Sequence, residues 1–273
     1  MTNAAAPPAS PMQLPSTWDA VAPGYAEAFA RHTAYAEEAL RIASPASSAR
    51  VLDVGTGAGA LAFAAAPRVA RVDAVDFSPG MIEQVRARCA REHVANVHAA
   101  VMDAQSLGFA DASFDAAFSL FTFMFVPDRA RAFRELHRVL SPGGRVVVAT
   151  WAPIDRRPMM KLGFDAMAEA LPELPQPQKG DLQQPDECIA ELSAAGFGAV
   201  GVSTFSASIR ADSSEHYLSI MERTGAPFAM LKKRLGEEGW AAATRRLLEA
   251  VRRRIPAGGV DLAAEAMLTS GTR

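Results

Sequence analysis

Three glycines at alternate positions follow a short apolar run that contains one acid. The run is Val51–Val54, with Asp53 inside it, and the glycines are Gly55, Gly57 and Gly59. An apolar run of this length before a glycine-rich turn predicts a buried parallel strand, and the helix-forming residues from Ala60 onward predict a helix directly after it. Glycines allow close backbone approach, and a helix N-terminus offers free N–H groups, so this stretch is typical of a nucleotide-binding corner.

Two kinds of nucleotide fit this corner. The spacing Gly55-x-Gly57-x-x-Ala60 also satisfies the fingerprint of dinucleotide-binding folds, whose pyrophosphate sits on the helix N-terminus. Asp53 lies two residues before the first glycine, where its carboxylate would repel a pyrophosphate. A carboxylate suits a ligand with an ammonium, such as S-adenosylmethionine. The residues therefore favour S-adenosylmethionine, and an NAD-dependent oxidoreductase is the less favoured alternative.

Two further acids follow predicted strands. Asp76 ends the apolar stretch Val69–Asp76, at the distance past the glycines where an acid can accept both hydroxyls of a ribose. Asp103-Ala104 follows the predicted third strand, Asn96–Met102. The Asp103 carboxylate can accept the adenine amino group, and a backbone N–H beside it can meet a ring nitrogen.

Strand and helix patterns alternate around these residues. Alternation of this kind predicts an α/β fold with a doubly wound, mostly parallel sheet. Later strands are expected at residues 116–120, 145–151 and 197–209, with an antiparallel last strand over 260–272 at the sheet edge. The predicted architecture is a Rossmann-like seven-stranded sheet with an N-terminal helical lid and helical insertions.

Several short motifs share their order with one known family. They are Val51–Gly59, Phe114-Asp115, Pro127-Asp128 and Arg138–Arg145. From Trp18 to Trp151 the chain resembles the class I S-adenosylmethionine-dependent methyltransferases of small-molecule type, which include quinone-biosynthesis and natural-product enzymes. The resemblance implies S-adenosyl-L-methionine as cofactor and S-adenosyl-L-homocysteine as product. It also implies that Trp18 and Tyr25, which could otherwise be core aromatics, form a lid in which Tyr25 reaches the methionine end of the cofactor.

The predicted site divides into a cofactor part and an acceptor part. The predicted cofactor contacts are Tyr25, Asp53, Gly55, Gly57, Gly59, Asp76, Phe77, Met81, Asp103, Ala104 and Ser119. The predicted acceptor contacts are Trp18, Phe121, Phe123, Trp151, Met160 and Phe164. Pockets lined by apolar and aromatic groups suit flat, largely apolar small molecules. We therefore expect O- or C-methylation of a small aromatic or polyketide-like acceptor, in secondary metabolism or quinone-type biosynthesis.

The residues leave the catalytic group open. Alignment of donor and acceptor supplies most of the rate, and a hydroxyl acceptor also needs a base. His32, His137 and His216 are possible bases by type, and His216, near the end of the sixth predicted strand, is the weak candidate. A methyltransferase-fold protein that binds the cofactor but catalyses another reaction, such as a cyclisation, is the alternative.

The chain of 273 residues divides by composition and pattern into five predicted segments. They are a disordered Ala/Pro-rich tail (1–15), a helical lid (16–47), the cofactor-binding core (48–151), a substrate-covering insertion with a helix (152–196), and C-terminal strands and helices that complete the sheet (197–273). The covering role of the insertion is implied by the resemblance.

Composition excludes several other classes. The formal net charge of -2 offers no general reason to expect nucleic acid as a partner. No apolar run is long enough to cross a bilayer and no signal-peptide pattern is present, so we expect a cytoplasmic protein with a small-molecule partner. Cys89 and Cys188 lack metal-ligand spacing, so no metal site is predicted. The basic residues of the predicted helix over 228–255 are expected to form a solvated surface, and the oligomeric state is left open.

Overall fold

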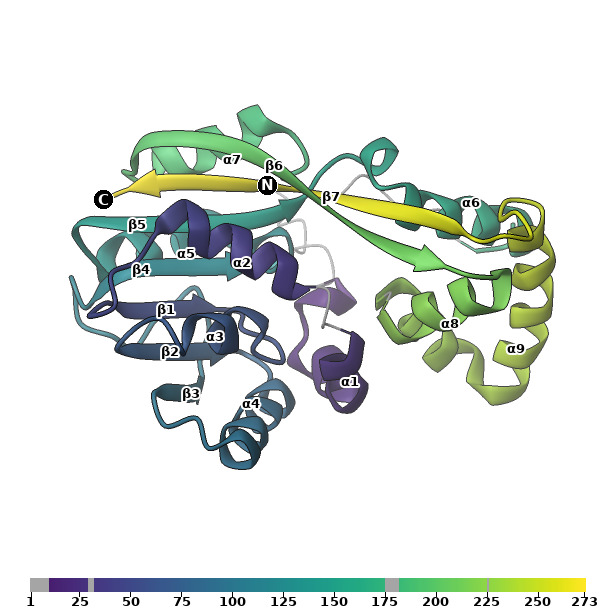
Figure 1. Ribbon diagram of the computed structural model, residues 1–273, viewed down its shortest axis with the longest axis horizontal. Helices are drawn as coiled ribbons and strands as arrows, with labels where there is room; N and C mark the ends of the chain where they lie inside the picture. The colour runs from purple at the N-terminus through teal and green to yellow at the C-terminus, as the bar shows by residue number, and fades with distance from the viewer. Residues whose placement is uncertain (1–9, 29–31, 175–181, 225) are drawn as a thin grey trace, which may run out of the picture.

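The computed structural model describes residues 10–28, 32–174, 182–224 and 226–273 (Figure 1). In these residues, seven strands form one sheet in the order β3-β2-β1-β4-β5-β7-β6. The strands are β1 (Arg50–Val54), β2 (Arg71–Asp76), β3 (Val97–Val101), β4 (Phe114–Leu120), β5 (Leu140–Trp151), β6 (Gly198–Ala211) and β7 (Val260–Thr272). Strands β1 to β5 pair in parallel, and β7 is antiparallel to both neighbours. The predicted doubly wound, mostly parallel α/β fold is confirmed.

The last strand does not lie at the sheet edge, as the sequence suggested. Strand β7 lies between β5 and β6, so β6 is the edge strand. Residues 266–272 of β7 pair with β5 on one side and with β6 on the other. Ala266–Thr269 are accordingly buried, whereas much of β6 is exposed. The more apolar strand takes the covered position, and the strand rich in serine and glycine takes the edge.

Helices cover both faces of the sheet (Figure 1). Helices α2 (His32–Ala43), α3 (Ala60–Ala65) and α4 (Pro79–Glu92) pack on one face, and α5 (Arg129–Val139) and α7 (Pro185–Ala194) pack on the other. Side chains of β1 alternate between the two layers, with Val51 in the first and Leu52 in the second. This layering brings the carboxyl ends of the parallel strands to a common edge, where ligands bind in open α/β sheets.

The distal halves of β6 and β7 carry a separate helical cap, defined here as α6 (Pro158–Ala170), α8 (Ser214–Thr224) and α9 (Ala226–Arg252). Figure 1 shows these three helices together, away from the five parallel strands. They share a hydrophobic core around Tyr217, Phe228 and Leu247. Basic residues of α9 form ion pairs with acids of the neighbouring helices, such as Arg252 with Glu215 at 2.6 Å, which agrees with a solvated, charge-paired surface.

The N-terminal part, predicted as a helical lid over 16–47, forms two helices. Helix α1 (Pro15–Ala28) precedes α2, and Figure 1 shows α1 between the sheet and the helical cap. Of the tail predicted to be disordered, residues 1–9 lie outside the described residues, whereas Pro11–Gln13 form a short 3-10 helix, η1. Among the helices that the structure describes, none is both long and apolar enough to span a membrane.

Candidate active site

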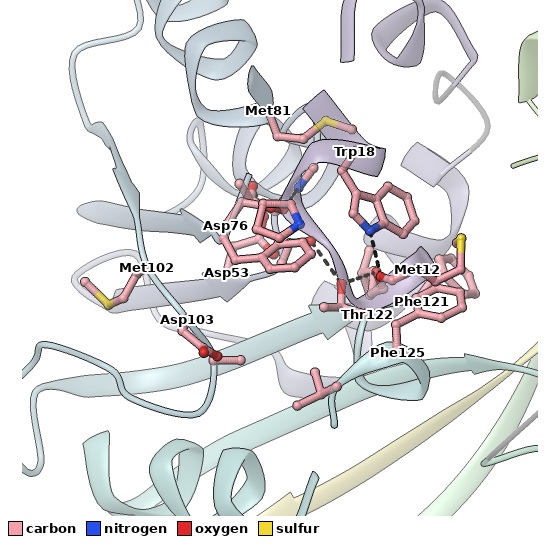
Figure 2. A pocket seen from close by; sticks show the side chains of 18 of the residues that line it. Met12, Trp18, Asp53, Asp76, Met81, Met102, Asp103, Phe121, Thr122 and Phe125 are labelled. Atoms are coloured by element: carbon pink, nitrogen blue, oxygen red, sulfur yellow. Dashed lines mark hydrogen bonds between the residues drawn. The ribbon is translucent and has the colours of Figure 1, made fainter. Parts of the chain in front are cut away.

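A cavity of about 290 Å³ lies at the carboxyl ends of the parallel strands, beneath α1 (Figure 2). In the view of Figure 2, Met102 and Asp103 lie on one side and Phe121 and Phe125 on the other. Of the residues predicted from sequence, those that line the cavity are Trp18, Tyr25, Asp53, Gly55, Gly57, Asp76, Phe77, Met81, Asp103, Ala104 and Phe121. The structure therefore brings most of the predicted cofactor contacts together.

The glycine loop is enclosed by side chains from distant segments. Gly57 has φ +53°, and a Cβ atom on it would lie 3.3 Å from the Tyr25 ring of α1. Gly55 has φ +70°, and a Cβ there would lie 2.2 Å from Thr122 Oγ1. These two positions therefore require glycine for both backbone conformation and space. Gly59 does not line the cavity, because it begins α3 and packs against Phe63.

Two buried carboxylates stand beside this loop. Asp53 is 1% exposed and accepts a hydrogen bond from Thr56 Oγ1 at 2.6 Å. Asp76 is 7% exposed and accepts hydrogen bonds from the backbone N–H groups of Gly57 and Ser78, both at 2.9 Å. Burial raises the pKa of Asp53 to about 7, and burial also raises the pKa of Asp76. Buried carboxyl groups with raised pKa values favour a ligand that supplies an ammonium group or hydroxyl donors.

Asp103 lines another part of the cavity and is more exposed. Its Oδ1 accepts hydrogen bonds from the backbone N–H of Gln105 at 2.8 Å and from Gln105 Nε2 at 3.0 Å. Ala104 is buried next to it, and Met102 and Gln105 also line this part. An acid, a backbone segment and apolar side chains thus meet at the end of β3, as expected for a site that holds a purine base.

Helix α1 closes the cavity from above. Trp18 Nε1 donates to the backbone carbonyl of Met12 at 2.9 Å, and the Trp18 ring lies 5.9 Å edge-on from the Tyr25 ring and 5.7 Å from the Phe125 ring. Asp19 Oδ1 accepts hydrogen bonds from Ser78 Oγ at 2.6 Å and from Gly80 N at 2.9 Å. Asp19 therefore caps the N-terminus of α4 from a different helix and holds α1 over the glycine loop.

An aromatic end of the cavity is built around Phe121. This residue has φ +59°, a strained conformation for a bulky side chain that is typical of functional sites. Its ring stacks on Trp151 with centroids 3.9 Å apart. The His32 ring meets Phe121 edge-on at 4.9 Å and Trp151 at 5.9 Å. Phe121 and His32 line the cavity, whereas Trp151 lies behind Phe121 and does not.

Several predicted residues lie elsewhere. Ser119 is fully buried and donates to the backbone carbonyl of Val54 at 2.7 Å, so it links β4 to β1. Phe123 is also fully buried and packs against Phe133 with ring centroids 4.5 Å apart. Both residues therefore belong to the interior of the sheet domain and do not reach the cavity.

Residues predicted in the C-terminal half are also outside the lining. Met160 and Phe164 lie on α6, and Met160 packs against the core of the helical cap. His216 lies on α8, where its Nδ1 accepts a hydrogen bond from the backbone N–H of Asp212 at 3.2 Å. The histidine on the lining is His32, whose position depends on where α2 begins and carries no local sequence signal.

Other lining residues were not predicted. Met12, Gln13 and Pro15 reach the cavity from η1 and the start of α1, and Thr122 reaches it from the segment after β4. Of the three phenylalanines after β4, Phe121 and Phe125 line the cavity, whereas Phe123 faces the core.

The glycine loop leads to the first prediction. Gly57→Val should abolish binding of S-adenosylhomocysteine, because its side chain would displace Tyr25 and fill the space beside the loop. Gly143→Val is the matched control, because Gly143 has φ +79° and its Cβ would meet nothing within 4 Å. Both variants should lose similar thermal stability, and calorimetry should show lost binding only for Gly57→Val. Equal binding by the two variants would contradict this account of the loop.

The pKa of Asp53 leads to a prediction about pH. Below about pH 7 the carboxyl is largely protonated, so an ammonium ligand must displace a proton. Affinity for S-adenosylhomocysteine should therefore rise with pH, by up to about tenfold per pH unit below the pKa, and level off above it. Asp53→Asn should bind more weakly and with a flatter profile. Asp73→Asn is the control, because Asp73 is buried and paired with Arg71 but does not line the cavity. A parent profile that is flat from about pH 5.5 to 7.5 would exclude the role of Asp53.

Known proteins are similar to this chain in sequence and in fold. Residues 52–148 match the family model described as a methyltransferase domain. Over 180 residues the chain is 31% identical to aklanonic acid methyltransferase of Streptomyces sp. (strain C5), a match that covers 60% of this chain and 81% of that protein. It is 38% identical over 134 residues to a demethylmenaquinone methyltransferase of Clavibacter sepedonicus, covering 48% of this chain and 52% of that protein.

A solved structure agrees with the fold. It is phosphoethanolamine N-methyltransferase 2 of Haemonchus contortus in complex with S-adenosyl-L-methionine, with a TM-score of 0.60 and 20% identity, covering 93% of this chain and 57% of that one. At this identity the likeness shows the fold alone. The family is shown by the sequence match to the aklanonic acid methyltransferase, which extends over most of that relative. The chain belongs to the class I S-adenosylmethionine-dependent methyltransferases of small-molecule type and is an enzyme of that class.

Proposed function

We propose that this enzyme methylates oxygen or an activated carbon of a small, flat, largely apolar acceptor of aromatic or polyketide type. The observation that carries the proposal is that His32, Phe121 and Phe125 line the same cavity as the glycine loop. Two relatives support it, since by their names they act on aklanonic acid and on demethylmenaquinone. We place the reaction in secondary metabolism or quinone-type biosynthesis.

The cavity residues fit S-adenosylmethionine. In the proposal Asp53 and Tyr25 hold the methionine end, Asp76 accepts the ribose hydroxyls, and Asp103 with Ala104 meets the adenine. Phe77 and Met81 supply apolar contact beside these acids. When bound, the cofactor supplies an electrophilic methyl group on a sulfonium, which the two buried carboxylates favour electrostatically.

The enclosure of the cavity favours a small acceptor. Helix α1 and η1 cover one side, and the segment after β4 covers another, so a bound acceptor would be shielded from water on these two sides. Such enclosure fixes the relative orientation of two reactants and thereby lowers the barrier to their reaction. A polymer would need an open groove, which a helix attached through Asp19 to α4 does not provide.

His32 is the group we propose to take a proton from a hydroxyl acceptor. It supplies the only imidazole among the described residues that line the cavity. Imidazole exchanges protons near neutral pH, which suits it to general base catalysis. Its ring lies edge-on to Phe121 at 4.9 Å, so an acceptor that packs on Phe121 would lie next to it. This role replaces the one that the sequence suggested for His216.

The proposed function is tested by supplying the full chain with S-adenosylmethionine labelled in its methyl group. A panel of flat phenols, enols and quinols should accept the label, with transfer rates that fall as the acceptor becomes more polar or less planar. Parallel reactions contain tRNA and a mixed protein extract. Label in tRNA or protein, and none in the small acceptors, would overturn the proposal.

The role of His32 is tested separately on a phenolic acceptor. On this acceptor His32→Asn should lower kcat by about 100-fold or more, while binding of S-adenosylhomocysteine stays close to that of the parent. His216→Asn is the matched control, since that imidazole does not line the cavity, and it should leave kcat unchanged. Loss of activity in His216→Asn but not in His32→Asn would reverse the assignment.

A further inference from the structure

Arg157 is a buried cation to which the structure gives no anionic partner. It precedes α6, where the chain leaves β5 for the helical cap, and it is 8% exposed. Its Nε is buried without a hydrogen-bond partner, and none of the described residues forms an ion pair or a side-chain hydrogen bond with the guanidinium. Its one aromatic contact is with Trp151, whose ring centroid lies 5.8 Å from Cζ.

The guanidinium nevertheless keeps its charge. Burial lowers the pKa of Arg157 to about 10, so the group is still protonated at neutral pH. An unpaired ion inside a protein is strongly unfavourable, and buried charges are normally paired. A cation–π contact at this distance offsets only part of that cost. A permanent charge in such a place favours a ligand that supplies the missing anion.

The neighbouring arginine shows the contrast. Arg156 is exposed and forms an ion pair with Glu265 Oε2 at 2.9 Å, whereas Oε1 of the same carboxylate is buried without a hydrogen-bond partner and forms no ion pair with Arg157. Two consecutive arginines therefore differ, because the exposed one has its anion and the buried one lacks it. Arg156 thus provides a control of the same residue type at the adjacent position.

Arg157 lies next to the aromatic end of the cavity. Trp151, which it contacts, stacks on Phe121, and Phe121 lines the cavity. Arg157 is also the N-cap residue of α6, a helix of 13 residues whose first N–H groups add positive potential at the same place. The guanidinium and the helix end both favour an anion behind the aromatic wall.

We propose that Arg157 and the N-terminus of α6 bind an oxyanion of the acceptor, either a carboxylate or an ionised acidic hydroxyl. The planar guanidinium is suited to such a group, because two of its N–H donors match two oxygens. The aromatic rings of the acceptor then pack on Phe121, and the oxyanion extends past the edge of the Phe121–Trp151 stack to Arg157. This inference rests on the proposed function and narrows its acceptor class to acid-bearing aromatics.

In this proposal the protein carries negative charge on the cofactor side of the site and positive charge on the acceptor side. Asp53 and Asp76 lie on the cofactor side, where a sulfonium and an ammonium bind, and Arg157 lies on the acceptor side. An oxyanion near a fixed cation is also stabilised in its ionised form, which keeps this group of the acceptor charged when it binds.

The test compares a hydroxynaphthoic acid with its methyl ester, with binding measured by calorimetry on the full chain in the presence of S-adenosylhomocysteine. The parent should bind the acid more tightly than the ester. Arg157→Met keeps most of the side-chain volume. It should weaken binding of the acid by about 10- to 100-fold and leave the affinities for the ester and for S-adenosylhomocysteine unchanged. Arg156→Met should retain the preference of the parent.

The outcomes test the role of Arg157 separately from the proposed function. Equal binding of acid and ester by the parent, or equal weakening of both in Arg157→Met, overturns the role of Arg157. If Arg157→Met does not fold, Arg157→Lys decides, because weaker acid binding with unchanged ester binding supports the role and equal loss overturns it. Binding of the acid that depends on Arg157, without methyl transfer to any small acceptor, leaves the anion site standing and rejects the proposed function.

Discussion

The close approach of the Tyr25 ring to Gly57 is the constraint on which the site depends. A Cβ atom at Gly57 would lie 3.3 Å from that ring, so the tight packing of α1 on the loop depends on glycine at this position. The N–H of Gly57 is meanwhile held by Asp76 at the end of β2. One residue thus joins the cofactor loop, the second strand and the covering helix, and Asp19 completes the closure through α4.

This closure explains the electrostatics of the cavity. Because α1 excludes water from the loop, Asp53 and Asp76 are buried and their pKa values are raised. A cationic ligand stabilises such buried carboxylates. They therefore favour binding of a sulfonium cofactor and disfavour binding of a pyrophosphate. On the other side of the Phe121–Trp151 stack, burial leaves Arg157 without an anion. Burial therefore favours a cationic ligand beside Asp53 and Asp76 and an anionic ligand beside Arg157.

Local signals in the sequence predicted the sheet and the cofactor side well. Asp76 and Asp103 end apolar strands, and parallel strands bring their carboxyl ends to one edge whatever the rest of the chain does. Residues whose place depends on distant packing were missed or named by type alone. Asp19 was missed because it acts through Ser78 and Gly80, which are 59 and 61 residues away in the sequence. His32 was named as a possible base by its type, but its place on the cavity depends on where α2 begins. Phe123 was misplaced because the left-handed backbone at Phe121 reorients the segment that follows it.

We propose that the cavity over the glycine loop binds S-adenosylmethionine and not a dinucleotide. Titration calorimetry of the full chain with S-adenosylhomocysteine and, in parallel, with NAD tests it most directly. The structure predicts saturable binding of S-adenosylhomocysteine at one site per chain and no heat from NAD. Binding of NAD without binding of S-adenosylhomocysteine would contradict the account of the loop, of its two acids and of the helix that covers them.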